Sequence, residues 1–374
     1  MDRAIDPRFV TEHLAQAAER LRAQRVDGLL VYAPANIRGF TGTPLGPSDR
    51  LVCAWITRSG QSVLICPRFE APEPTTLSPG VSVRTWDEHE NPFAIAADSA
   101  GELGIAAGTL LLDGETSLTT RRGLEAALPR ATLREDGGII AAVRAIKSAG
   151  ECDTIAAACG RVGRLYGEIG RRLRAGECEQ ALARDAAAAL GDGELSQGLP
   201  MVQGGPNAAV PHRAPGERAL CEGDCVVVDF VLRIEGYHGD MTRTFVVGRP
   251  SEKMRSAYRA VRAAQRAALA AIRPGMTCES IDAAARRAID EAGFGRAFFH
   301  RTGHGIGLDC HEPPYLVAGN TTRLSPGHCV TVEPGIYLPG EFGIRIEDCA
   351  VVTPEGHRVL SAGVPTDVSK ALEG

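Results

Sequence analysis

Two stretches in the C-terminal half of the chain repeat one pattern, and this repeat constrains the fold more than any other feature. Residues 223–229 (GDCVVVD) and 327–333 (GHCVTVE) both begin with glycine, continue as a short apolar run and end on a carboxylate. Such runs are typical of buried β-strands. A second carboxylate follows each stretch, Asp240 after the first and Glu347 after the second. The repeat predicts an internally duplicated domain whose strands bring carboxylates together in pairs.

The spacing within each pair indicates a hairpin. Asp229 and Asp240 are out of phase with the alternation of a single strand, so the chain must turn between them, at residues 233–236. Glu333 and Glu347 flank a Pro-Gly turn signal, which predicts the same arrangement. A single pair of hairpin acids is usually an exposed feature without function. Two pairs in matching contexts favour a binding site instead.

A histidine, His304, lies between the two pairs in the glycine-rich segment 302–307 (TGHGIG). Its spacing from His300 would suit a zinc-binding helix, but the flanking glycines disfavour a helix, so we expect a strand or loop. Carboxylates that share a site repel one another, and divalent cations offset this repulsion. Four carboxylates and one imidazole therefore predict a site for two divalent cations, which points to a hydrolase.

The composition excludes several other classes of protein. A net charge of −5 provides no basic surface for nucleic acid or for an acidic membrane. The N-terminus lacks a signal-peptide pattern and no apolar run is long enough to span a bilayer, so a cytoplasmic protein is expected. The 11 cysteines are an odd number, and no two have the Cys-x-x-Cys spacing, which argues against a disulfide framework.

The length and periodicity predict two domains, residues 1–145 and 146–374. The first alternates predicted helix and strand, and the second opens with a helical stripe that starts near Glu151. The remaining expected elements are a helix over 11–24, strands over 28–33, 51–56, 62–66 and 109–112, and two helices capped by Ser251 and Thr277.

Five blocks resemble those of the pita-bread metallopeptidases. They are residues 207–212 (NAAVPH), 228–245 (VDF through DMTRTF), 302–314 (TGHGIG through HEPP), 332–337 (VEPGIY) and 343–348 (GIRIED). The chain is most similar to the Xaa-Pro dipeptidases (prolidases) and Xaa-Pro aminopeptidases of that family, from residue 147 onward. The resemblance implies an α+β fold, with a C-terminal pita-bread domain of duplicated α-β units behind a smaller α/β creatinase-like domain.

The resemblance also implies a set of metal ligands. Asp229 would bind one ion, Asp240 and Glu347 would bridge both ions, and His304 and Glu333 would complete the second. The ions would lie roughly 3.5–4 Å apart and activate a hydroxide for attack. Mn²⁺ is the expected metal because oxygen ligands dominate, with Co²⁺ or Zn²⁺ as alternatives.

Roles for the surrounding residues follow from the same resemblance. Glu333 would also shuttle a proton, and His311 would donate a hydrogen bond to the scissile amide and the oxyanion. His212, like His311, would be catalytic and contact substrate, and His300 would line the substrate site. Arg345 would brace the site or bind the substrate carboxylate.

The implied activity is cleavage of the Xaa-Pro bond at the N-terminus of dipeptides or short peptides, by a cytoplasmic homodimer. One alternative is a metal-dependent hydrolase or lyase of the same fold that acts on a small non-peptide amide or osmolyte. Another is a non-catalytic binding module, which is disfavoured because all five ligand positions hold ligand residues.

Overall fold

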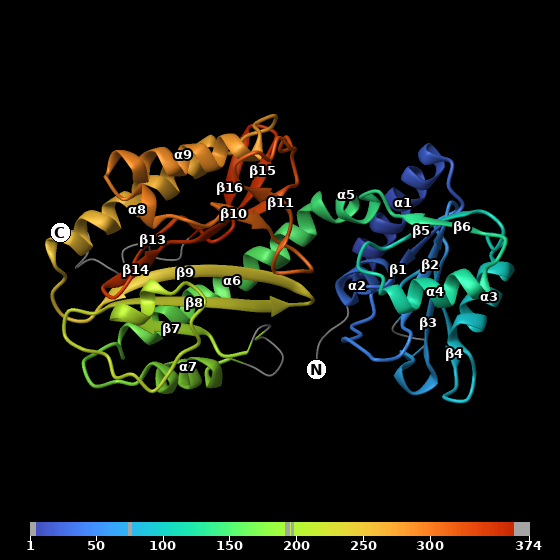
Figure 1. The fold of residues 1–374 in the computed structure, drawn as a ribbon, viewed down its shortest axis with the longest axis horizontal. Helices are drawn as coiled ribbons and strands as arrows, with labels where there is room; N and C mark the ends of the chain where they lie inside the picture. The colour runs from blue at the N-terminus through green and yellow to red at the C-terminus, as the bar shows by residue number, and fades with distance from the viewer. Residues whose placement is uncertain (1–4, 74–76, 191–194, 196–197, 363–374) are drawn as a thin grey trace. The chain divides into compact units, whose positions relative to one another are not determined.

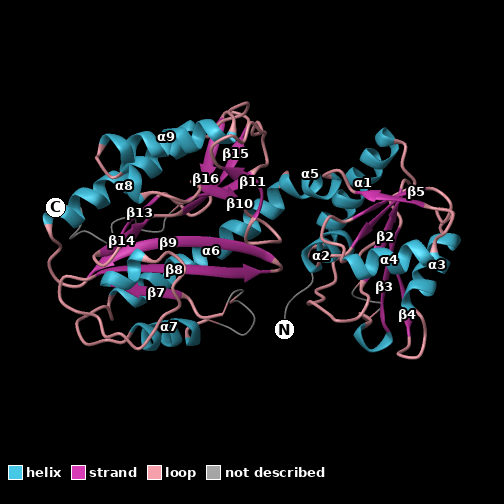
Figure 2. Ribbon diagram, viewed as in Figure 1, coloured by secondary structure: helices cyan, strands magenta, loops and turns pink. Residues whose placement is uncertain are grey.

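The computed structural model describes residues 5–73, 77–190, 195 and 198–362. They fall into two compact units, divided in the sequence between Arg144 and Ala145 (Figure 1). Both units contain helices and strands (Figure 2). No helix in the described part of the chain combines the length and apolar character that a membrane crossing requires.

The N-terminal unit is built on a mixed sheet of six strands in the order β4-β3-β2-β1-β5-β6. Its elements are α1 (Pro7–Gln24), β1 (Gly28–Val31), α2 (Pro34–Thr41), β2 (Cys53–Thr57), β3 (Ser62–Pro67), β4 (Val81–Trp86), α3 (Pro92–Glu102), β5 (Thr109–Leu112), α4 (Leu118–Ala127), β6 (Thr132–Glu135) and α5 (Ile139–Ala145). The expected hairpin of β2 and β3 is present and antiparallel. The first helix begins earlier than predicted, because Asp6 caps it and Pro7 occupies its first turn.

The C-terminal unit repeats a pattern of two helices followed by antiparallel strands. The first copy contains α6 (Ala149–Gly170), α7 (Glu179–Ala188), β7 (Met201–Gly204), η3 (Gly205–Ala209), β8 (Cys225–Ile234) and β9 (Tyr237–Val246). The second contains α8 (Glu252–Ala271), α9 (Cys278–Glu291), η4 (Gly295–Ala297), β10 (Gly303–Gly305), β11 (Glu312–Leu316), β12 (Cys329–Val332), β13 (Gly335–Leu338), β14 (Phe342–Arg345), β15 (Asp348–Thr353) and β16 (Gly356–Val359). The predicted duplication of α-β units is therefore confirmed.

The strands of this unit lie between two sets of helices (Figure 1). Helix α6 packs against β8 and β9, whereas α8 packs against β12, β13 and β14. The strands form three antiparallel sheets, β7-β8-β9, β11-β10-β12-β15-β16 and β13-β14. The apolar faces of α8 and α9 and the strands beneath them share one buried core.

The repeated glycines mark equivalent turns in the two copies. Gly223 precedes β8 with φ 86°, and Gly327 precedes β12 with φ 93°. Both angles lie in the left-handed region, which glycine adopts at little cost. The sequence repeat thus reflects a shared turn before each strand that leads to a carboxylate.

Of the two N-caps that the sequence predicts in this unit, one makes the expected capping hydrogen bond and the other does not. Ser251 caps α8 by accepting from the backbone N–H of Met254. Thr277 also stands at the N-cap position of α9, but its side chain makes no capping hydrogen bond. Its backbone instead pairs with Arg323, and its carbonyl accepts from Ser280 Oγ. The predicted helix is correct and the predicted capping contact is wrong.

Candidate metal centre

The first carboxylate pair lies on one face of the β8–β9 hairpin. The chain turns at Glu235 and Gly236, with φ 47° and 89°, within the expected segment. Asp229 lies opposite Thr242, and Asp240 lies opposite Val231. Because residues two apart on a strand share a face, Asp229 and Asp240 are diagonal neighbours on the same side.

The second pair lies where a long hairpin bends. Val332 pairs with Asp348 on one side of the bend, and Gly335 pairs with Arg345 on the other. Glu333 and Glu347 occupy the two unpaired junctions between these segments. We expected both pairs to share one hairpin arrangement. The first pair instead lies within continuous strand pairing, whereas the second lies where the strand pairing is interrupted.

The imidazole of His304 lies next to both pairs. His304 is the central residue of β10, which pairs with β11 and β12. A Cβ atom on Gly303 would lie 1.9 Å from the carbonyl oxygen of Thr331, and one on Gly305 would lie 2.4 Å from that of Pro313. These glycines are needed because neighbouring backbones approach the strand closely. The predicted strand or loop position of His304 is correct.

The hydrogen bonds of His304 determine which ring nitrogen faces the acids. Nδ1 lies 3.0 Å from the carbonyl oxygen of Gly305, which can only accept, so Nδ1 carries the hydrogen. Nε2 lies 3.2 Å from Glu333 Oε1 and 3.9 Å from Asp240 Oδ2. A histidine that donates through one nitrogen to a carbonyl presents the other nitrogen as a metal ligand.

A buried arginine braces Asp229. Arg345 Nη2 donates to Asp229 Oδ2 over 2.6 Å, Nε donates to Thr242 Oγ1 over 3.0 Å, and Nη1 donates to Tyr337 OH over 3.0 Å. Thr242 Oγ1 in turn donates to Glu347 Oε2 over 2.8 Å. Of the two roles expected for Arg345, these contacts favour bracing.

The positive groups of the protein only partly neutralise the negative charge of these acids, as their pKa values indicate. Burial and the neighbouring Asp229 carboxylate raise the pKa of Asp240 to about 7. Burial and the neighbouring Asp240 carboxylate raise the pKa of Glu347 well above its usual range, and burial raises the pKa of Asp229 although Arg345 opposes the rise. Burial also acts to raise the pKa of Glu333, but the contact with His304 outweighs it and lowers the value to about 2.

Two oxygens in the cluster have no hydrogen-bond partner among the residues that the structure describes. Asp229 Oδ1 and Glu347 Oε1 are buried and have no hydrogen bond. Ligand atoms of Asp240, His304 and Glu347 all lie within 4.8 Å of one another. Buried polar atoms are normally paired, and a divalent cation is the partner that unpaired carboxylate oxygens select. The residues present therefore fit the divalent cations that the sequence predicts.

Three further histidines, His212, His300 and His311, lie near this cluster and are less buried than His304. The ring centroid of His311 lies 4.2 Å from that of His304, although His311 as a whole is exposed. Partial burial of the ring and the neighbouring His304 lower the pKa of His311 to about 4. His212 is exposed and close enough to His311 to influence it electrostatically.

His300 is half-buried and linked to the arginine through a tyrosine. Its Nδ1 lies 2.7 Å from the carbonyl oxygen of Arg301, so Nδ1 donates and Nε2 accepts. Tyr337 OH lies 3.0 Å from that Nε2 and receives the hydrogen bond of Arg345. The structure thus connects Arg345, Tyr337 and His300 in one chain of hydrogen bonds.

Sequence reasoning assigned no role to several residues that hold these groups in place. Gln203 Nε2 lies 3.1 Å from the carbonyl oxygen of Pro211 and 2.7 Å from that of Arg213, the two neighbours of His212. Thr242 and Tyr337 are contained in the blocks that carry the family resemblance, and that was their only sequence signal. Gln203 has no such signal.

Comparison with known proteins agrees with this geometry. The family model for metallopeptidase family M24 matches residues 153–354, and the creatinase/prolidase N-terminal domain matches residues 13–146. A probable dipeptidase PepE of Mycobacterium tuberculosis is 34% identical over 359 residues, covering 95% of each chain. A Xaa-Pro dipeptidase of Lactobacillus delbrueckii is 32% identical over 362 residues, covering 94% of this chain and 96% of the relative.

Solved structures show the same relationship. The dipeptidase PepE of Mycobacterium ulcerans superposes with a TM-score of 0.86 at 34% identity, covering 96% of each chain. A prolidase from Thermococcus sibiricus superposes with a TM-score of 0.83 at 31% identity, covering 93% of this chain and 95% of the other. The chain belongs to metallopeptidase family M24, with a creatinase/prolidase N-terminal domain before its pita-bread domain.

Proposed function

We propose that the chain is a two-metal peptidase that removes the residue before proline from dipeptides or short peptides. The observation that carries this proposal is the buried cluster of Asp229, Asp240, His304 and Glu347, in which two carboxylate oxygens have no partner. Ionised acids packed this closely repel one another, and bound divalent cations would offset that repulsion.

The ligand roles are those that the family resemblance implies. Asp229 would bind one cation through its free Oδ1, since Arg345 occupies Oδ2. Asp240 and Glu347, one from each pair, would bridge the cations, and His304 and Glu333 would complete the second one. The cations would lower the pKa of bound water, so that water can act as a nucleophile at neutral pH.

The protein's own groups would handle the proton and the substrate. Glu333 is held as a carboxylate by its contact with His304, so it can accept a proton and pass it towards the leaving nitrogen. His311 is neutral at pH 7 and can donate an N–H to the developing oxyanion. His212 and His300 would contact the substrate beside it.

The substrate class rests on the relatives. One is named a Xaa-Pro dipeptidase and another a prolidase, and the matches cover 94% and 93% of this chain. Mn²⁺ is proposed as the metal because carboxylate oxygens dominate the ligand set. A homodimer is proposed on the family resemblance alone, and a cytoplasmic location is proposed on the sequence features given above.

Turnover of Ala-Pro, Gly-Pro and Ala-Pro-Ala, measured after chelation and after addition of Mn²⁺, tests the proposal. Cleavage that Mn²⁺ restores is expected, and the relative rates separate a dipeptidase from an aminopeptidase. If the protein binds two metal ions per chain and leaves all three peptides intact, the peptide substrate is wrong. The alternative of a small non-peptide amide would then replace it.

A further inference from the structure

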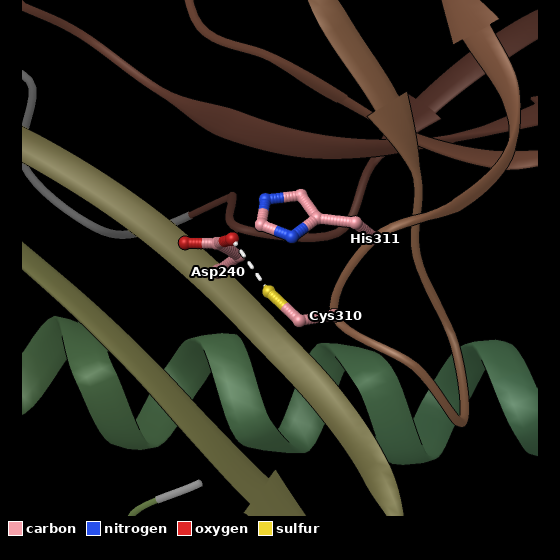
Figure 3. A group of neighbouring side chains, drawn as sticks. All are labelled: Asp240, Cys310 and His311. Atoms are coloured by element: carbon pink, nitrogen blue, oxygen red, sulfur yellow. Dashed lines mark hydrogen bonds between the residues drawn. The ribbon is translucent and has the colours of Figure 1, made fainter. Parts of the chain in front are cut away.

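A second group of metal-ligating side chains lies beside the carboxylate cluster and includes a thiol. Cys310 Sγ donates a hydrogen bond to Asp240 Oδ2 over 3.1 Å. Ligand atoms of Asp240, Cys310 and His311 all lie within 4.8 Å of one another. Figure 3 shows Asp240 on β9 facing Cys310 and His311, which come from the segment between β10 and β11.

The positions of these three groups suit one small cation. A tetrahedral ion with bonds of about 2.0–2.3 Å holds neighbouring ligand atoms roughly 3.3–3.8 Å apart. The separation of 3.1 Å between the thiol and the carboxylate is already close to this range. Cys310 is buried whereas His311 is exposed, so an ion could enter from solvent on the imidazole side.

The donor chemistry of this group differs from that of its neighbour. Sulfur and nitrogen donors select Zn²⁺ and Cd²⁺, whereas a set of carboxylates selects harder ions such as Mn²⁺. We propose that Asp240, Cys310 and His311 form a separate site for a thiophilic divalent cation such as Zn²⁺ or Cd²⁺. The site shares Asp240 with the proposed catalytic centre.

Binding would exchange a proton for the metal. The S–H bond of Cys310 breaks, its proton passes to solvent, and a bond between sulfur and the cation forms, with no change of oxidation state. The cation also takes a nitrogen of His311 and an oxygen of Asp240. If the proposed function holds, excess Zn²⁺ therefore inhibits hydrolysis, because the bound cation occupies one nitrogen of His311 and fixes the ring away from the substrate.

Cd²⁺ titration of the full-length, Mn²⁺-loaded protein tests the site without any substrate. The ultraviolet absorption of a cadmium–thiolate bond is expected to saturate at one Cd²⁺ per chain, with release of one proton. Cys310→Val should abolish the absorption and weaken Cd²⁺ binding at least about tenfold, the lower end of losses at metal sites. Cys221→Ser, which removes an exposed thiol, is the matched control and should change neither.

Two results would overturn the site. One is a cadmium–thiolate band that survives in Cys310→Val, which would place the bond at another cysteine. The other is stoichiometric release of Mn²⁺, seen by its electron paramagnetic resonance signal, which would place Cd²⁺ in the carboxylate centre. Cys310→Ser serves as a second variant if the valine protein does not fold.

Zn²⁺ inhibition is then measured for each variant relative to its own uninhibited rate. Cys310→Val should need at least about tenfold more Zn²⁺ for half-inhibition. The two proposals fail separately in this design. If the cadmium–thiolate absorption appears but peptides are not cleaved, only the proposed function is rejected. If peptides are cleaved but the absorption does not appear, only the thiol site is rejected.

Discussion

Arg345 Nη2 lies 2.6 Å from Asp229 Oδ2, and both side chains are buried. This ion pair occupies one oxygen of the carboxylate and leaves the other, Oδ1, without a partner. Arg345 is itself held by Thr242 and Tyr337. The pair therefore orients the free oxygen of Asp229 while supplying only part of the positive charge that the cluster needs.

Replacement of Arg345 by methionine is expected to weaken metal binding. Asp229 would lose its orienting partner, and affinity for Mn²⁺ should fall about 10–100-fold, as for other supporting groups of metal sites. The free energy of unfolding of the chelated protein, from which a chelator has removed the metal, should also fall by about 3–5 kcal/mol. The reason is that the buried carboxylate of Asp229 is left without its ion-pair partner. Metal titration and chemical denaturation measure the two effects.

The control for this experiment is Arg358→Met. Arg358 forms an exposed ion pair with Asp153, so its loss should cost less than about 1 kcal/mol and leave metal binding unchanged. Equal metal affinity in Arg345→Met and the unmodified protein would reject the bracing role.

Asp240→Asn should separate metal binding from folding. The substitution removes a charge from a repelling group, so the chelated protein should unfold at the same or a higher denaturant concentration. Peptide turnover should be lost, because the proposed bridging carboxylate is gone. Retained turnover would show that Asp240 does not bridge the metals.

The stability of the chelated protein should depend on pH in a defined direction. The pKa of Asp240 rises from 3.8 to about 7 on folding, so the folded state holds a proton that the unfolded state has released. The contribution of Asp240 to stability therefore falls as pH rises from about 4 to 7. Glu347 and Asp229, whose pKa values are also raised, act in the same direction.

The neighbouring groups do not all act in this direction. The pKa of His311 is lowered from 6.5 to about 4, so its contribution to stability rises with pH over that range and opposes the fall. The pKa of Glu333 is lowered from 4.5 to about 2, so its contribution is complete above pH 4.5 and is lost only in acid. The pKa of His304 is raised from 6.5, so its contribution is lost as pH rises above that value. The stability of the unmodified protein should therefore fall relative to that of Asp240→Asn as pH rises from 4 to 7, as measured by thermal unfolding after metal removal. An equal pH dependence of the two proteins would contradict the raised pKa of Asp240.

His311→Ala should impair the chemical step more than binding. Removal of one hydrogen-bond donor to an oxyanion typically lowers kcat about 10²–10³-fold. KM should change less, since the interaction strengthens in the transition state. His89→Ala, at an exposed histidine of the other unit, provides the control. A change confined to KM would assign His311 to substrate binding alone.

Gln203→Leu tests the support of His212. The amide donates to carbonyls on both sides of His212, so its loss should loosen that segment without touching the acids. We expect a fall in kcat/KM of about tenfold with unchanged Mn²⁺ affinity. Loss of metal binding in this variant would indicate a wider structural role for Gln203.

Local patterns predicted much of the fold. The β8–β9 hairpin and the helix capped by Ser251 depend on short-range rules of turn and cap chemistry. Thr277 shows where such rules stop, because a strand pairing made by residues far along the chain replaced its capping contact.

The sequence by itself determined the residue types of the candidate site and the hairpins that carry them, since both follow from local alternation and from repeated glycines. Only the tertiary structure decided which atoms meet. Arg345 and Asp229, Gln203 and the neighbours of His212, and Cys310 and Asp240 are each joined by packing between separate strands and loops. Such contacts depend on register and burial across the whole unit, which no local spacing records.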